Sequence, residues 1–397
     1  MPGPALAHAL TQPYGLPVSP LVAAAAGAAL VVAVALAWPE RGGRPAPPAD
    51  ARLASWAGSL SRAQVVTRAV AVVMLALAIA AGRAGADDEL ENLAPALVVG
   101  AAWPLLVAAS IVVGPVWRWA DPWDAAARVF GRGQRDEPPP HVWPAVVVAL
   151  PWVWYLSAYR APLDPRSVGA VLAVYTLVTL AGCLAIGRVR WLASAEPLGL
   201  VLSWAALLPR GRLADWHPAR GAEALLGVLA GGVLFGAVRR SELWGDLNTV
   251  SHATLVATLG LVASCAVVAG LLAGSAALTR PRARAAVARG AVAALAGIVV
   301  AVAMERNRLF TSIQLLPGLL GDPFGRGWDL FGRAGAGLDP APLGTRGLLA
   351  AQLSVVLAAH LVGAAVAAHR LRRRDREPAA AGLGLLGGAS VLALASH

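Results

Sequence analysis

Long apolar runs recur along the chain and predict membrane-spanning helices. A spanning helix needs about 20 mostly apolar residues, and ten segments of this kind can be marked. They are 19–38, 65–82, 93–117, 142–159, 167–187, 222–238, 249–274, 285–304, 347–369 and 379–396. The pattern therefore predicts an all-α polytopic membrane protein with about ten transmembrane helices, folded as one domain over residues 1–397.

Two stretches between these runs have a different pattern. The segment 191–209 is short and contains Trp191, Trp204 and Pro209, which is typical of a helix lying at the membrane interface. The segment 305–346 is the longest connection between spans. Loops of more than about 15 residues are often binding lids, so this long loop is a candidate cover for a site.

The composition supports a bilayer environment and excludes several partners. Hydrophobic residues make up 58% of the chain and charged residues only 14%, whereas soluble domains carry about 25% charged residues. All 33 basic residues are Arg, which excludes a Schiff-base lysine and a P-loop lysine. The Ala, Gly, Arg and Pro excess is typical of a GC-rich genome, so the net charge of +11 does not predict a nucleic-acid partner. The lipid bilayer is the expected partner.

Arginines in the short loops predict the orientation. Loops and span ends on one side hold 22 Arg, and the loops on the other side hold 10. Because positive charge favours the cytoplasmic side, the first set is expected in the cytoplasm of a cell-membrane protein, with both termini outside. Arg68 is the one arginine left over, and we expect its side chain to snorkel toward the cytoplasmic surface.

Ionisable side chains inside a bilayer cost free energy and are functional candidates for that reason. His360 falls near the middle of the span 347–369, and Gln352 and Gly363 extend a narrow polar stripe on the same helix. His360 is either a ligand or proton carrier in a cavity, or a neutral imidazole bonded to a neighbouring helix.

The seventh and eighth spans add polar residues near the predicted outer surface. Asn248 and His252 lie one turn apart, and Glu305 and Arg308 end the eighth span, either at the interface or paired within the bilayer. Asp329 lies in the long loop above them. These positions predict an outward-facing polar cavity between spans seven, eight and nine, with His360 on one wall.

Evidence for a metal site is sparse. Cys183 and Cys265 both lie in apolar runs without a neighbouring ligand and are interpreted as packing residues. Near the amino terminus, Ala5-Leu6-Ala7 forms a small-x-small cleavage pattern before His8. If cleavage occurs there, the new terminal amine and the His8 imidazole would form a weak candidate site for copper or nickel.

The stretch 322–332 reads DPFGRGWDLFG, and the helix that follows carries Gln352, His360 and Gly363. Together with Asp121-Pro122-Trp123 and Glu196-Pro197, it resembles a family of actinobacterial multi-pass membrane proteins, some labelled fenitrothion hydrolase-like. The resemblance covers most of the chain and implies a membrane protein with an outward amino terminus. Family members carry a His-Tyr-Phe-Ser run late in span eight, where this chain has 305–308 as ERNR.

Three functions follow as hypotheses. The first is a transporter or permease-like protein for a small solute or metal ion, with His360 and His252 as ligands or proton carriers. The second is a membrane-embedded hydrolase with His360 as general base, and the third is a non-catalytic scaffold subunit. No catalytic motif supports the hydrolase, and no repeat between the two halves of the chain supports a two-repeat transporter.

Overall fold

The computed structural model describes residues 19–39, 60–130, 141–241, 244, 253–278, 281–333, 337–369, 371 and 373–395. Over these ranges, eight helical segments are long and apolar enough to cross a membrane. They are α2 (Pro20–Ala37), α4 (Arg62–Ala84), the π-helix η1 (Pro95–Ala102) continued by α5 (Trp103–Val112), α9 (Pro165–Ile186), α14 (Ala253–Leu278), α15 (Pro281–Met304), α17 (Gly344–Ala368) and α18 (Arg373–Ala395). Two shorter apolar helices, α8 (Trp143–Ser157) and α12 (Ala222–Val238), complete the set.

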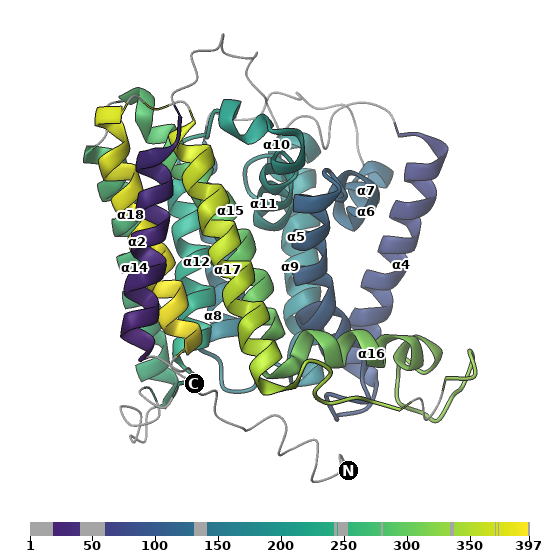
Figure 1. The fold of residues 1–397 in the computed structure, drawn as a ribbon. Helices are drawn as coiled ribbons and strands as arrows, with labels where there is room; N and C mark the ends of the chain where they lie inside the picture. The colour runs from purple at the N-terminus through teal and green to yellow at the C-terminus, as the bar shows by residue number, and fades with distance from the viewer. Residues whose placement is uncertain are drawn as a thin grey trace.

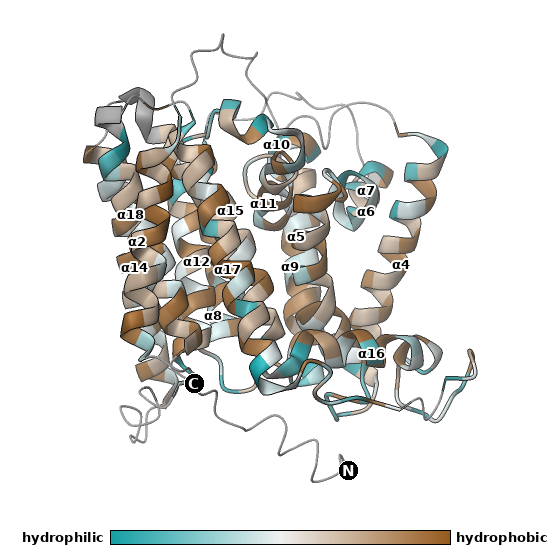
Figure 2. Ribbon diagram, in the orientation of Figure 1, coloured by the Kyte–Doolittle hydropathy of each residue, from teal (hydrophilic) through white to brown (hydrophobic). Residues whose placement is uncertain are grey.

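These helices coincide with the ten segments predicted from the hydropathy pattern, so the all-α membrane class is confirmed. The number of helices that cross the bilayer and the side on which the termini lie stay predictions. Figure 2 shows apolar residues along the lengths of the helices, with polar residues more frequent at both ends of the bundle.

Capping residues explain several helix boundaries. Ser61 and Gln64 form a reciprocal capping box at the start of α4, in which each side chain accepts a hydrogen bond from the other residue's backbone. Asp164 caps α9 just before Pro165, and Gly187, with a φ of 108°, ends it. Pro at the first helical position and Gly after the last are the residues that these positions favour.

Small residues allow the helices in the interior to approach closely. α15 is mostly buried and crosses α17 where Gly290 faces Gly363; a Cβ on Gly290 would lie 2.9 Å from the Gly363 carbonyl oxygen. In the same way, Gly231 of α12 lies against Cys265 of α14. Packing of this kind drives helix association in membranes, where apolar surface gains nothing by leaving lipid.

The first and last helices of the described chain pack side by side (Figure 1). Gly388 of α18 lies against Ala24 of α2, and Gly384 lies against Ala28, so the two helices run antiparallel. At the other end, the Arg376 guanidinium at the start of α18 donates to the Leu36 carbonyl at the end of α2. The N-terminal helix α2 is therefore packed with the C-terminal helices of the bundle.

The connection between α9 and α12 corrects the predicted interfacial helix over 191–209. It contains α10 (Arg188–Leu192), α11 (Pro197–Ala205) and two 3₁₀ turns, and every residue of α11 except the half-buried Leu198 is buried in the bundle. Trp204 stacks on Trp216 with a centroid distance of 4.9 Å, and the Arg289 guanidinium of α15 donates to the Trp216 carbonyl. The segment is therefore packed inside the bundle and does not form a single helix on its surface.

The predicted loop 305–346 also contains regular structure. A 3₁₀ turn at Glu305–Asn307 leads into α16 (Arg308–Gly321), which lies along one end of the bundle (Figure 1). Two further short helices, α6 (Trp117–Ala120) and α7 (Pro122–Phe130), follow α5 at the opposite end. The predicted loop is therefore a helix followed by a turn-rich stretch.

Candidate functional site

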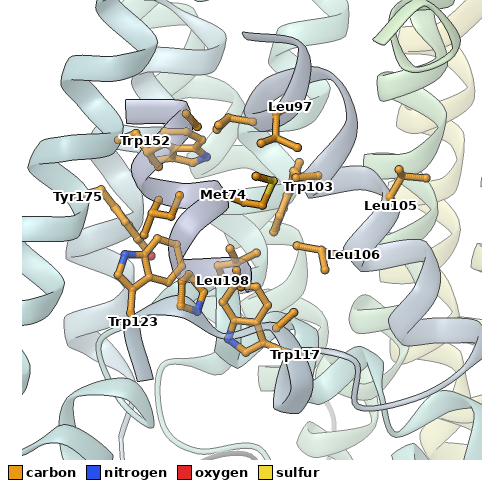
Figure 3. Close-up of a pocket in the computed structure, with 18 of the residues that line it drawn as sticks. Met74, Leu97, Trp103, Leu105, Leu106, Trp117, Trp123, Trp152, Tyr175 and Leu198 are labelled. Atoms are coloured by element: carbon orange, nitrogen blue, oxygen red, sulfur yellow. The ribbon is translucent and has the colours of Figure 1, made fainter. Parts of the chain in front are cut away.

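The structure contains an apolar cavity of about 540 Å³ between α4 and the rest of the bundle, here called the α4 cavity (Figure 3). Its wall combines aromatic side chains with aliphatic ones. They include Trp103, Trp117, Trp123, Trp152, Tyr175, Met74, Leu97, Leu105, Leu106 and Leu198. Leu105 is 41% exposed, so the cavity reaches the outer face of the bundle beside α5. An apolar wall that opens toward lipid suits an apolar or amphipathic guest.

α4 is held to the bundle at both ends, and the cavity lies along its middle. At one end it crosses α9 through paired glycines: a Cβ on Gly82 would lie 2.8 Å from the Gly169 Cα and 2.7 Å from the Pro165 carbonyl oxygen. At the other end Thr67 donates to the Trp119 carbonyl, and Arg68 donates to the Arg118 carbonyl at 3.0 and 2.8 Å. Met74, between the two contacts, faces the α4 cavity.

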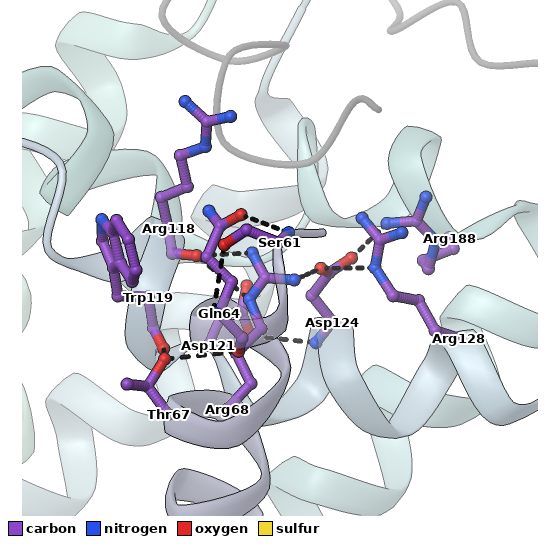
Figure 4. A network of polar contacts seen from close by, with 10 residues as sticks. All are labelled: Ser61, Gln64, Thr67, Arg68, Arg118, Trp119, Asp121, Asp124, Arg128 and Arg188. Carbon is purple, nitrogen blue, oxygen red and sulfur yellow. Dashed lines mark hydrogen bonds and ion pairs between the residues drawn. The ribbon is translucent and has the colours of Figure 1, made fainter. Parts of the chain in front are cut away.

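A buried group of charged side chains lies at the end of α4 that contains Thr67 and Arg68 (Figure 4). We define the Arg–Asp cluster as Arg68, Asp121, Asp124, Arg128 and Arg188. The Asp124 carboxylate contacts Arg68 and Arg188 and accepts from Arg128 Nε at 2.9 Å. Asp121 and Asp124 are fully buried and Arg68 is 1% exposed. Charges removed from water are stable only when paired in this way.

Local sequence places these carboxylates. The Asp121 carboxylate accepts from the Asp124 backbone N–H at 2.9 Å, which is N-cap geometry, and Pro122 starts α7. The cap turns Asp124 toward Arg68 of α4 and Arg188 of α10. The snorkelling predicted for Arg68 is therefore wrong: its side chain is buried and contacts the Asp124 carboxylate.

A second buried carboxylate lies beside the cavity wall. Tyr175 lines the α4 cavity, and its hydroxyl donates to the Glu196 carboxylate between α10 and α11. Glu196 also accepts from the Leu198 and Gly199 backbone N–H groups at 3.0 and 2.6 Å, as the N-cap of α11. Burial, together with the charge of Asp121, raises the pKa of Glu196 to about 7.

A smaller, more polar pocket of about 270 Å³ lies at the opposite end of the bundle and is here called the α16 pocket. Its charged and hydroxyl residues are Glu89, Arg308, Thr311 and Ser312, and its apolar residues are Leu90, Pro95, Ala96, Gly100, Leu163 and Leu315. Arg308, Thr311 and Ser312 belong to the first turns of α16, and Glu89 follows α4 in the chain.

The π-helix η1 separates the two spaces. Leu97 and Val98 line the α4 cavity, whereas Pro95, Ala96 and Gly100 line the α16 pocket. Ser312 of α16 packs against Gly100, where no larger side chain fits. π-helices are rare and occur frequently at functional sites, which makes this partition the candidate functional region.

The structure gives His360 and Gln352 different surroundings from the predicted polar cavity. His360 is buried, as expected, but its Nδ1 lies 2.8 Å from the Val356 carbonyl oxygen of its own helix, and its ring packs against Gly387 of α18. Over the described residues, Nε2 has no hydrogen-bond partner. Gln352 instead donates to the Ala301 carbonyl of α15. His360 and Gln352 therefore contact different helices, and neither lines the α4 cavity or the α16 pocket.

The remaining predicted site residues are dispersed. The Glu305 carboxylate accepts from Arg240 Nε, after α12, at 2.8 Å, and Asp329 accepts from the Arg333 backbone N–H at 2.6 Å. Arg308 alone lines one of the two spaces described above, the α16 pocket. Asn248, His252 and His8 lie outside the described residues.

Metal ligands do not gather in the described ranges: no three His, Cys, Asp or Glu side chains there come together as a metal-binding group. Cys183 and Cys265 are free thiols on different helices, and Cys265 lies 3.5 Å from the Val228 carbonyl oxygen. Their interpretation as packing residues agrees with these contacts.

Sequence reasoning missed the Arg–Asp cluster and the α4 cavity. The Asp-Pro-x-Asp pattern at 121–124 is a recognisable helix start, and Arg68 is an ionisable residue within an apolar run. Both signals were present, but their pairing joins segments more than 50 residues apart.

Comparison of the chain with protein-family models, with curated proteins and with solved structures found no match.

Proposed function

We propose that this membrane protein is a transporter or permease-like protein whose cargo is an apolar or amphipathic small molecule that enters from the bilayer. The α4 cavity carries this proposal, because it is wide enough for such a molecule and its wall is almost entirely apolar. A small ion or polar solute would lose its hydration there without gaining hydrogen bonds. Of the cargoes expected from the sequence, a small solute or a metal ion, the proposal keeps the small solute and specifies it as apolar or amphipathic.

Two further features support transport rather than simple storage. The α4 cavity and the α16 pocket lie on either side of η1, so one helix segment divides a space inside the bundle from a polar space at its end. At the other end the Arg–Asp cluster fixes α4 to α7 and α10. A guest would enter the α4 cavity beside the exposed Leu105 and would have polar groups available at each end of the bundle.

Binding is tested first, with the purified full-length protein in detergent micelles and the fluorescent probe N-phenyl-1-naphthylamine. Energy transfer from the cavity tryptophans to the probe should saturate and should be displaced by a single-chain amphiphile. Ala149→Phe inserts a ring into the cavity wall and should weaken binding at least about tenfold, since overfilled space excludes the guest. Val147→Phe is the matched control on the same helix, where the side chain is 66% exposed.

Transport is tested separately in proteoliposomes with an NBD-labelled lysophospholipid. Reduction of NBD by external dithionite reports how fast the lipid moves between leaflets, and the protein should accelerate this movement while Ala149→Phe should not. Equal probe binding by Ala149→Phe and Val147→Phe would reject the cavity as the site. Binding without accelerated movement would reject transport and leave a binding protein.

A further inference from the structure

We propose that the α16 pocket is a second ligand site, specific for a small zwitterionic group that carries both an anion and an ammonium. The site lies apart from the α4 cavity, and the inference holds whether or not the protein transports an amphiphile. Its volume of about 270 Å³ fits a headgroup-sized molecule rather than an acyl chain.

The anion-binding half of the site is the start of α16. Among the residues that the structure describes, no side chain caps this 14-residue helix, although Asn307 occupies its N-cap position. An uncapped N-terminus attracts anions through the helix dipole and its backbone N–H groups. Arg308, the first residue of the helix, lines the pocket and adds a full positive charge.

Two buried polar atoms at this helix start have no partner among the described residues. Thr311 lines the pocket at 9% exposure, and its hydroxyl makes no hydrogen bond; the Asn307 side-chain oxygen, 3% exposed, makes none either. Asn307 is also in the left-handed region, with a φ of 56°. Unpaired buried polar groups cost free energy, and strained residues concentrate at ligand sites. A bound anion would supply the acceptor that the Thr311 hydroxyl lacks.

The ammonium-binding half is Glu89. It lines the same pocket, where partial desolvation raises its pKa and the positive charge of Arg308 lowers it, so the two groups act on each other. Asp88 adds a second negative charge beside Glu89. A simple anion would meet repulsion from these carboxylates. A ligand with an ammonium group a few bonds from its anion satisfies both ends of the pocket.

The probes are O-phosphoethanolamine, which carries both charges, and its two halves, inorganic phosphate and ethanolamine. Calorimetric titration of the full-length protein in uncharged detergent should show saturable binding of phosphoethanolamine, weaker binding of phosphate and none of ethanolamine. Arg308→Gln should weaken phosphoethanolamine binding on the order of 10–100-fold, because it removes charge-assisted hydrogen bonds. Thr311→Val, which keeps the shape and removes the hydroxyl, should weaken it several-fold.

Glu89→Gln separates a zwitterion site from an anion site. It should weaken phosphoethanolamine binding and strengthen phosphate binding, because the repulsion is removed. Arg166→Gln is the matched control: this exposed arginine pairs with Asp87 at the same end of the bundle and does not line the pocket. Its binding constants should equal those of the wild type.

The same chemistry occurs in a lipid headgroup, and a second arm distinguishes that source. In nanodiscs, retention of phosphatidylethanolamine over phosphatidylglycerol that Arg308→Gln abolishes would support the site with lipid as its ligand. Saturable phosphoethanolamine binding in detergent would support it with a soluble ligand. Phosphate binding that equals phosphoethanolamine binding, and that Glu89→Gln leaves unchanged, would overturn the zwitterion assignment. Absence of binding in both arms would overturn the site itself.

Discussion

Neutralising Asp124 removes the central charge of the Arg–Asp cluster and is expected to destabilise the protein strongly. Asp124→Asn keeps the shape of the side chain but removes a carboxylate that contacts Arg68, whose side chain is 1% exposed. Removing one partner of a buried ion pair costs about 3–5 kcal/mol. Arg128 and Arg188 are partly solvated, at 25% and 19% exposure, and Asp121 still acts on Arg68. We therefore expect the lower end, about 3 kcal/mol.

The free energy of unfolding can be measured by reversible unfolding in mixed micelles. Asp87→Asn is the control, because Asp87 pairs with Arg166 on the exposed surface, and it should have no resolvable effect. The double variant Arg68→Met, Asp124→Asn should recover part of the stability lost by Asp124→Asn alone, since the buried cation is then absent. A loss for Asp124→Asn no larger than for Asp87→Asn, or no recovery in the double variant, would refute the reasoning.

Three further predictions concern the helix contacts, the midplane histidine and pH. Gly82→Leu should cost about 3 kcal/mol, because its side chain meets the backbone of Gly169, whereas Gly270→Leu, with open space around it, should be close to neutral in the same unfolding assay. His360→Asn should change the thermal unfolding temperature but leave probe binding in the α4 cavity intact, and a loss of binding would contradict its packing role. The pKa of Glu196 is raised from 4.5 to about 7, so its contribution to stability is fully present below pH 4.5 and is lost as pH rises toward 7; unfolding measured across this range should show that fall in the wild type and not in Glu196→Gln.

The helices were predictable because the signal for a membrane span is local. The predicted range 222–238 has the same bounds as α12, and 19–38 differs from α2 by one residue at each end. Whether a segment of about 20 residues can span a membrane depends only on the hydropathy of those residues and on the thickness of the bilayer. The segment 191–209 has the same apolar character, and the sequence could not show that α11 is buried against other helices rather than against lipid.

The site residues were harder to predict because they depend on which helices are neighbours. The energetic argument that His360 must be buried was right, but the expected bond to a neighbouring helix was not: among the described residues its partner is the Val356 carbonyl, one turn earlier on its own helix. Arg308 was expected in a polar cavity between spans seven, eight and nine, and the pocket that it lines in the structure is formed with Glu89 and η1 instead. A cavity forms where neighbouring helices leave space between them, and the sequence pattern does not show which helices are neighbours.

The antiparallel pairing of α2 with α18 has a consequence for how the protein is made. α2 is the first helix of the described chain to leave the ribosome and α18 is the last, so α2 must wait in the bilayer while about 340 residues are added, about 20–70 s at ordinary synthesis rates. The hydropathy of the two helices agrees with this difference in the order of synthesis. The mean hydropathy of α2 is 2.4, which favours insertion of this helix on its own. The mean hydropathy of α18 is 1.7, and arginines lie in its first turn and just before it, so we expect this helix to gain from a partner already in the bilayer. We therefore expect the insertion of α18 to depend on α2.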